Sequence, residues 1–272
     1  MIWVIYKNEL IKASKRLATW VTFLFFSFIV FMEYGSSYFE ARNNDERYFG
    51  LPEEWPDIIA SDGQIQSIFA AVILILLVAS EFQWRTSRQN VIDGLSKNQW
   101  FVGKLLLVPT VAIVLYGWRV VLAGFFAWLG TDASVSSDPM VSGVHVAAAA
   151  SVLIGVLLIV SLAYFLAMAV RNSGPAMGLF LVFLFIEQIF TAIFTRFGWE
   201  FAAKLLPFGV ADRFFRWIQY DPVAFDAAVR QAVEADRAPP EIWDAGFLYA
   251  AGLGWTAVLL LGSYLWYRKR DL

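Results

Sequence analysis

Six long apolar stretches constrain the fold of this chain more than any other feature. They cover residues 17–34, 65–82, 105–129, 144–170, 175–195 and 246–267. A helix needs about 20 residues to cross a hydrocarbon core of about 30 Å, and backbone polar groups in lipid must be hydrogen-bonded within the protein. We therefore predict an all-α, polytopic membrane protein, with six transmembrane helices in a single domain over residues 1–272.

Composition excludes several classes of function. Hydrophobic residues make up 59% of the chain and charged residues 16%, against about 25% charged residues in soluble domains. The net charge of −2 gives no overall positive field, so nucleic acid is not an expected partner. The chain has no cysteine and one histidine, which excludes a thiolate or multi-histidine metal site and a cysteine nucleophile.

The loops between the apolar stretches alternate in charge. One set, which includes both chain ends, contains twelve Lys and Arg against four Asp and Glu. The other set, residues 35–64, 130–143 and 196–245, contains eight Lys and Arg against seventeen Asp and Glu. Because Lys and Arg are enriched in cytoplasmic loops, we expect both ends in the cytoplasm (N-in/C-in). The expected location is the cell (inner) membrane, as a multi-pass protein in contact with lipid.

The N-terminal residues 1–16 form a separate expected element. Apolar side chains recur at helical spacing, apart from the cations Lys12, Lys15 and Arg16, and they are Ile2, Tyr6, Leu10, Ala13 and Leu17. This pattern predicts an amphipathic helix in the cytoplasmic interface. A helical extension of the first span is the alternative.

The outer segment 196–245 is the longest connection. Its aromatic first half contains too many charges to span the membrane. Asp221 followed by Pro222 is a typical helix start, and Pro239 and Pro240 predict the end of that helix. We therefore expect a polar outer helix in this segment. The single histidine, His145, is expected to be hydrogen-bonded or interfacial.

The connection over residues 83–103 is polar and, by its charge, cytoplasmic. The run up to Ile92 has no Pro or Gly, which favours a helix. Asp93 and Gly94 predict its end, because glycine readily adopts the left-handed conformation found after helices. Ser96 is a typical N-cap for a second helix that leads into the third span. The sequence therefore predicts a short helix held beneath the membrane.

A pattern of eight residues runs through this region: Glu81, Arg85, Thr86, Arg88, Gly94, Lys97, Gly103 and Lys104. It resembles the permease subunits of ABC type-2 transporters, which carry a glutamate, a short Arg/Thr-containing helix, a Gly turn and an aromatic-Gly-Lys entry to the third span. The resemblance extends in architecture to the basic N-terminal helix, the turn at Arg171, the outer stretch with Pro207 and the terminal YRKRDL. Motif-level similarity is limited to the cytoplasmic segment.

The resemblance implies that 83–103 contains a coupling helix, which docks on a separate cytoplasmic ABC ATPase subunit. It assigns ATPase coupling to Glu81, Arg85, Thr86, Arg88, Gln89, Asp93, Gly94 and Lys97. It also implies a homodimer, because six spans are half of the usual twelve, and an outer accessory protein is a further candidate partner. Without the resemblance, the segment is equally well read as a solvated positive loop that only orients the protein.

No ATP-binding or catalytic motif is present in the sequence. A P-loop requires Gly-Lys followed by Ser or Thr, whereas Gly103-Lys104 is followed by Leu105. We therefore expect no enzymatic activity and no cofactor in this chain, with ATP and Mg bound by the partner ATPase. The predicted function is a permease that moves or extrudes a substrate with ATP hydrolysed by that subunit. The alternative is an ATPase-independent secondary transporter or channel.

Two charged residues stand out within the apolar stretches. Arg119 follows Lys104 by roughly 22 Å of helix, and Glu187 follows Arg171 by roughly 24 Å, so both are expected at similar depth. A charge at membrane depth is costly unless it is paired or faces water. The two residues are therefore candidates for an intramembrane ion pair or for the lining of a substrate pathway.

The topology can be tested by cysteine labelling, because the chain has no native cysteine. We expect single cysteines at Asn44 and Ala228 to react with an impermeant thiol reagent in intact cells. A cysteine at Asn98 should react only after the cells are opened. Labelling of Asn98 with protection of Ala228 would invert the topology.

Overall fold

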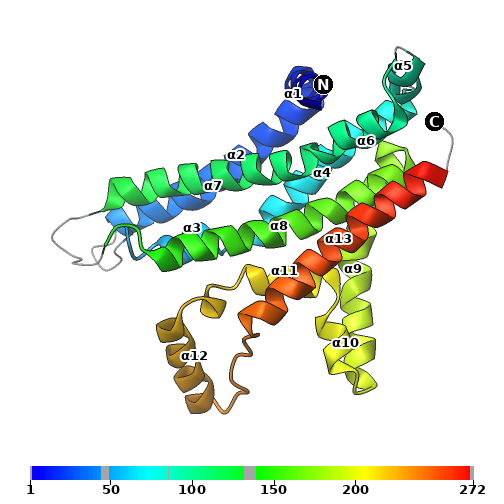
Figure 1. The fold of residues 1–272 in the computed structure, drawn as a ribbon. Helices are drawn as coiled ribbons and strands as arrows, with labels where there is room; N and C mark the ends of the chain where they lie inside the picture. Colours follow the sequence, from blue (N-terminus) through cyan, green and yellow to red (C-terminus); the bar gives the residue numbers. More distant parts are fainter. Residues whose placement is uncertain (1, 44–48, 85, 93, 132–138, 270–272) are drawn as a thin grey trace.

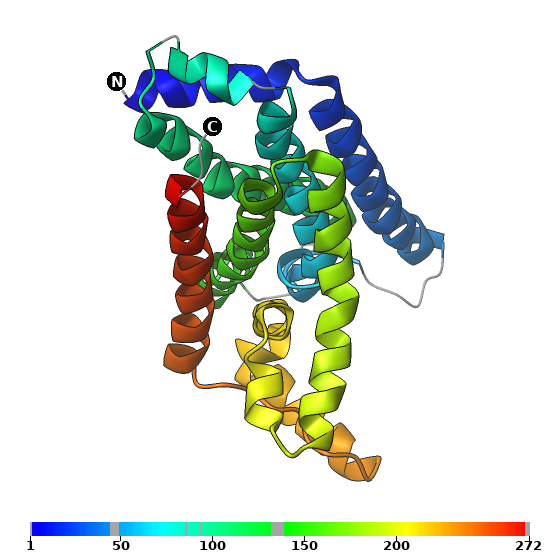
Figure 2. The same cartoon turned by 90° about the vertical axis from the view of Figure 1, so that its right-hand side faces the viewer.

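The computed structural model describes residues 2–43, 49–84, 86–92, 94–131 and 139–269. Helices make up 84% of the structure, and the described residues form no strand. The helices form an elongated bundle, shown in two views in Figures 1 and 2. The short helices α1, α5 and α6 lie at one end, the α5 end, and α10, α11 and α12 lie at the other, the α12 end.

Within the described residues, six helices are long and apolar enough to cross a membrane, which agrees with the predicted number. They are α2 (Leu17–Asn43), α4 (Gly63–Gln83), α7 (Leu107–Gly130), α8 (Gly143–Val170), α9 (Ser173–Arg196) and α13 (Ala245–Lys269). Two of these candidate spans begin with a shorter helix. Helix α3 (Trp55–Ile59) precedes α4, and helix α6 (Lys97–Leu105) precedes α7. The chain is thus a multi-pass, all-helical membrane protein by the length and composition of its helices.

Helix α2 extends beyond its predicted end. The apolar stretch was expected to stop at residue 34, but α2 continues through the polar run EYGSSYFEARN to Asn43. None of these residues is a proline, and tertiary contacts at Tyr34 and Gly35 bury this part of the helix. The helix is therefore longer than its apolar stretch, because helix formation itself does not require apolar side chains.

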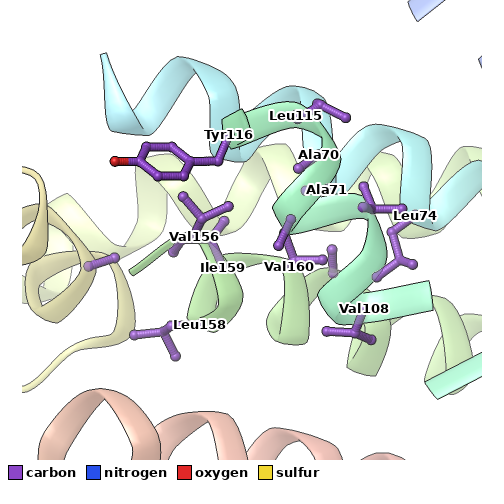
Figure 3. Close-up of a cluster of buried hydrophobic side chains, with 14 of the residues drawn as sticks. Ala70, Ala71, Leu74, Val108, Leu115, Tyr116, Val156, Leu158, Ile159 and Val160 are labelled. Atoms are coloured by element: carbon purple, nitrogen blue, oxygen red, sulfur yellow. The ribbon is translucent and has the colours of Figure 1, made fainter. Parts of the chain in front are cut away.

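Helix α8 lies at the centre of the bundle and packs against α4, α7, α9, α11 and α13. Its side chains are apolar on nearly all sides, as expected of a central helix, and from Ala148 on most of them are buried, whereas Val144 and Val146 in its first turn are exposed. Figure 3 shows Val156, Ile159 and Val160 of α8 against Ala70 and Leu74 of α4. All five are buried. The small side chains of α4 let the two helices approach closely, as is common in membrane proteins.

The segment between α9 and α13 folds into short helices at the α12 end. These are α10 (Glu200–Lys204), α11 (Pro207–Phe214), a 3-10 turn at Trp217–Gln219, and α12 (Pro222–Glu234). Asp221 caps α12 as predicted, because its Oδ1 accepts a hydrogen bond of 2.9 Å from the Val223 amide. The predicted stop at Pro239 and Pro240 is wrong: the helix ends at Glu234, and Asp236 then takes a positive φ of 50°.

Helix α1 (Ile2–Lys15) is a separate helix, as predicted, and Leu10 and Ala13 of the expected apolar face pack partly buried against the core. Its buried residues are Ile5 and Glu9, whereas Ile2 is 55% exposed and Leu17, at the start of α2, is 77% exposed. The reason is electrostatic: Glu9 faces a buried lysine on α6, so the face that carries Glu9 turns inward. Its position in the membrane interface stays a prediction.

Two glycines allow α11 to pack directly on the bundle. A Cβ at Gly155 of α8 would lie 2.7 Å from Phe214 Cβ, and a Cβ at Gly252 of α13 would lie 2.6 Å from Phe214 Cε2. Both distances are shorter than van der Waals contact. Phe214 itself is fully buried. Helix α11 is therefore packed directly against α8 and α13.

This packing predicts the effect of adding one methyl group. We expect Gly155→Ala to destabilise the protein by about 1–3 kcal/mol, because the new Cβ overlaps Phe214 and the α11 backbone cannot move without losing its own contacts. Gly117→Ala on α7 is the matched control, since its Cβ would meet no atom within 4 Å. Thermal unfolding in detergent measures both. Equal melting temperatures for the two variants would contradict this account of α11.

Candidate functional site

A buried cluster of charges joins three helices at the α5 end. Lys104 of α6 forms ion pairs with Glu81 of α4, at 2.7 Å, and with Glu9 of α1. The three residues are 1%, 1% and 5% exposed. Charges removed from water to this extent are stable only when they are paired and hydrogen-bonded. The cluster therefore determines how α1, α4 and α6 sit against one another.

Further cations complete the cluster from α1 and the turn after it. Lys12 contacts Glu9 at 2.9 Å and Glu81 at 3.3 Å, and Arg16 lies 3.8 Å from Glu81. Burial lowers the pKa of Lys12, but the Glu81 and Glu9 carboxylates raise it by more, so the net pKa is above its usual value. Two carboxylates thus share three cations, which keeps the cluster positive.

Neighbouring side chains hold this cluster in place. Trp100 Nε1 donates to Glu81 Oε2 at 3.2 Å, and the Trp100 ring stacks on Tyr267 of α13 at 5.4 Å between centroids. The Tyr267 hydroxyl donates to the Lys97 carbonyl at 3.1 Å. A Cβ at Gly103 would lie 2.7 Å from Ile5 Cγ2, so a glycine is needed for α1 to approach α6. The Gly103-Lys104 pair therefore has a structural role.

Helix α5 (Thr86–Ile92) lies directly after this cluster, in the segment predicted to couple to an ATPase. Gly94 has a φ of +107° and ends the turn as predicted. Ser96 caps α6 through a reciprocal pair of hydrogen bonds with Gln99, at 2.9 and 3.2 Å. The predicted helix, turn and second helix are all present.

Six of the eight residues assigned to coupling lie among the described residues, and five of these six are exposed. Thr86, Arg88, Gln89, Gly94 and Lys97 are exposed. Glu81 is buried in the ion cluster, so it is unable to contact a partner protein and instead supports the segment from inside. Arg85 and Asp93 lie outside the described residues.

The two intramembrane candidates, Arg119 and Glu187, have separate partners. Arg119 of α7 is 1% exposed and donates to the carbonyls of Asp57 and Ile58 in α3, at 2.7 and 2.8 Å, and to the Tyr34 hydroxyl at 2.7 Å. Carbonyl dipoles of α3 and a tyrosine replace the expected carboxylate. The ion pair suggested by the sequence is not formed, and the role of either residue in a pathway stays a prediction.

Glu187 of α9 lies against α11. Its Oε1 accepts a hydrogen bond of 2.8 Å from the Gly209 amide, near the N-terminus of that helix. The residue is 6% exposed, and Oε2 has no hydrogen-bond partner among the described residues. Helix N-termini attract negative charge. Glu187, which the sequence suggested as the partner of Arg119, is therefore a carboxylate at the start of α11.

Sequence reasoning missed several charged residues of these sites. Glu9 and Arg16 were counted among the loop charges, although Ile5, Glu9 and Arg16 recur at helical spacing on one face of the chain. Lys104 was part of the eight-residue pattern, but its ion pairs with Glu9 and Glu81 were not predicted. Glu33, in the first apolar stretch, was also missed. Its side chain lies within hydrogen-bonding reach of Asp62, close to Arg119. Their common signal is a charge inside, or within one helical turn of, an apolar run.

His145 is hydrogen-bonded, in line with the expectation from its sequence position. Its Nδ1 accepts from the Ser142 amide at 3.1 Å, and its own amide donates to Ser142 Oγ at 3.4 Å, which caps the start of α8. The ring stacks on Trp217 at 5.9 Å. Within the described ranges, no group of three His, Cys, Asp or Glu side chains is arranged to bind a metal.

Comparison with known proteins identifies no relative: no family model matches the chain, and no curated protein sequence matches it. The functional interpretation therefore depends on the geometry. At the α5 end, that geometry is a short exposed helix supported by a buried ion cluster. At the α12 end, it is a buried, half-satisfied carboxylate.

The ion cluster predicts a large effect of removing its central cation. We expect Lys104→Met to destabilise the protein by about 3–5 kcal/mol, because two buried carboxylates lose their shared partner. Lys7→Met is the control, since Lys7 is an exposed cation on α1, the helix that carries Glu9. Adding Glu81→Gln to Lys104→Met should recover part of the loss. Unfolding curves in detergent distinguish these outcomes, and a Lys104→Met protein as stable as the control would contradict the role of the cluster.

Proposed function

We propose that the chain is the transmembrane permease subunit of an ABC transporter in the cell (inner) membrane. In this proposal it moves or extrudes a substrate with ATP that is hydrolysed by a separate cytoplasmic ATPase subunit. ATP and Mg are bound by that subunit. The observation that carries the proposal is helix α5, a short exposed helix fixed to the bundle by a buried cluster of charges.

The exposed surface of α5 has the chemistry of a docking site. Arg88 and Gln89 are exposed on it. At its two ends lie Trp84, which is 65% exposed, and Ile92, which is 71% exposed. Exposed aromatic residues and arginines are enriched where proteins bind one another. This combination favours a protein partner over a solvated loop that only orients the chain.

The buried cluster gives α5 a mechanical connection to the membrane helices. Glu81 lies near the end of α4, directly before α5, and Lys104 lies near the end of α6, the helix between α5 and α7. Their ion pair joins the two stems of the α5 segment, and Glu9 joins the same pair to α1. A movement of the ATPase against α5 would therefore be passed to α1, α4 and α7 together, rather than absorbed by a flexible loop.

The proposed assembly is a homodimer with two ATPase subunits. Helix α9 exposes a large apolar surface along most of its length, including Leu181, Phe185 and Ile189. In a bilayer, such a surface contacts lipid or a second copy of the chain. An ATPase-independent secondary transporter or channel is the competing function, and it requires no partner at α5.

The proposal is tested by purifying the tagged chain from its native membrane. We expect an ABC ATPase to purify with the wild-type chain. Reversing the charge at Arg85 and Arg88 should abolish this association while leaving the fold intact, because the loss of charged contacts in an interface costs about 2–5 kcal/mol. The measurements are mass spectrometry of the purified complex and its ATP hydrolysis.

The matched control reverses two exposed arginines at the opposite end, Arg230 and Arg237. These variants should retain the ATPase. The absence of an ATPase from the wild-type preparation would reject the permease function in favour of the ATPase-independent alternative. An ATPase that still binds and is still stimulated after reversal at Arg85 and Arg88 would reject the coupling role of α5.

A further inference from the structure

A cavity of about 430 Å³ lies between α4, α8, α9 and α11. Its volume falls in the range of about 300–1,000 Å³ that is typical of small-molecule sites. Glu187 lies in its wall, 6% exposed, with the Oε2 atom unpartnered among the described residues. Gly209, whose amide holds the other carboxylate oxygen, also lines the cavity.

Among the described residues, no cation forms an ion pair with Glu187. The partners of its carboxylate are backbone amides at the start of α11. The second carboxylate in the wall, Asp212, is already paired with Arg216. The cavity therefore contains one carboxylate whose charge is unmatched, and a cation is the ligand that would match it.

The remaining walls are suited to the body of an organic cation. Phe185, Phe208 and Phe215 line the cavity, and aromatic faces attract cations as well as apolar groups. Gln188 and Thr191 of α9 also line it and are exposed, so they mark its open side. A small inorganic ion would leave the aromatic walls without a contact, whereas a cation with an apolar body would use both features.

We propose that this cavity binds hydrophobic organic monocations, such as ammonium or phosphonium compounds, with Glu187 as the charged contact. Phe185, Phe208 and Phe215 contact the apolar body of the ligand. The cavity opens on the exposed side of α9, past Gln188 and Thr191. That such cations are the transported substrates rests on the proposed permease function, whereas their binding does not.

The test is a binding measurement on the purified chain in nanodiscs, without any ATPase. The probe is methyltriphenylphosphonium, and triphenylphosphine oxide is the neutral compound of similar shape. We expect the wild-type chain to bind the cation in preference to the neutral compound. Glu187→Gln should weaken cation binding by about tenfold or more. Its amide oxygen still accepts from Gly209, which preserves the contact with α11.

Glu234→Gln, at the exposed end of α12, is the matched control and should bind the cation as the wild-type chain does. Thr191→Trp narrows the open side of the cavity, one helical turn from Glu187, and should weaken binding of both probes. The proposal is overturned if Glu187→Gln binds the cation as tightly as the control, or if the wild-type chain does not prefer the cation. It is also overturned if Thr191→Trp leaves cation binding unchanged. Because no ATPase is present, these results are independent of the association test for α5.

Discussion

The ion pairs of Lys104 with Glu81 and Glu9 connect the parts of this protein that chain connectivity alone leaves independent. Each residue comes from a different helix and each is buried, so none can leave the cluster without exposing an unpaired charge to a low dielectric. Helix α1 is oriented by this requirement, which turns Glu9 inward and leaves Ile2 exposed. Helix α5 then begins and ends on stems whose separation is held by one ion pair.

The number of long apolar helices could be predicted from the sequence, because lipid imposes a length and a polarity that are visible in a single chain, whereas the short helices α3, α10 and α11 were not predicted. The caps at Ser96 and Asp221 and the turn at Gly94 were also predictable, since local hydrogen bonding determines them. The end of α2 and the stop of α12 were not, because tertiary contacts and a local turn decide them.

The partners of the buried charges could not be predicted from depth alone. Arg119 and Glu187 occupy similar positions along their helices, yet Arg119 bonds to α3 carbonyls and Glu187 to the start of α11. Both α3 and α11 are short helices whose backbone groups at the ends lack partners within the helix. Sequence reasoning compared side-chain charges with one another and left out these backbone groups, which form hydrogen bonds with both buried charges.

The buried carboxylates at the two ends of the bundle differ in their partners. At the α5 end the carboxylates of Glu9 and Glu81 are saturated with cations, which makes a rigid joint with no capacity for a further ligand. At the α12 end Glu187 retains a free oxygen in a cavity. Helix α8 packs against both α4, which carries Glu81, and α9, which carries Glu187. Helix α4 belongs to both sites, because its residues Gln64 and Ser67 also line the cavity that contains Glu187.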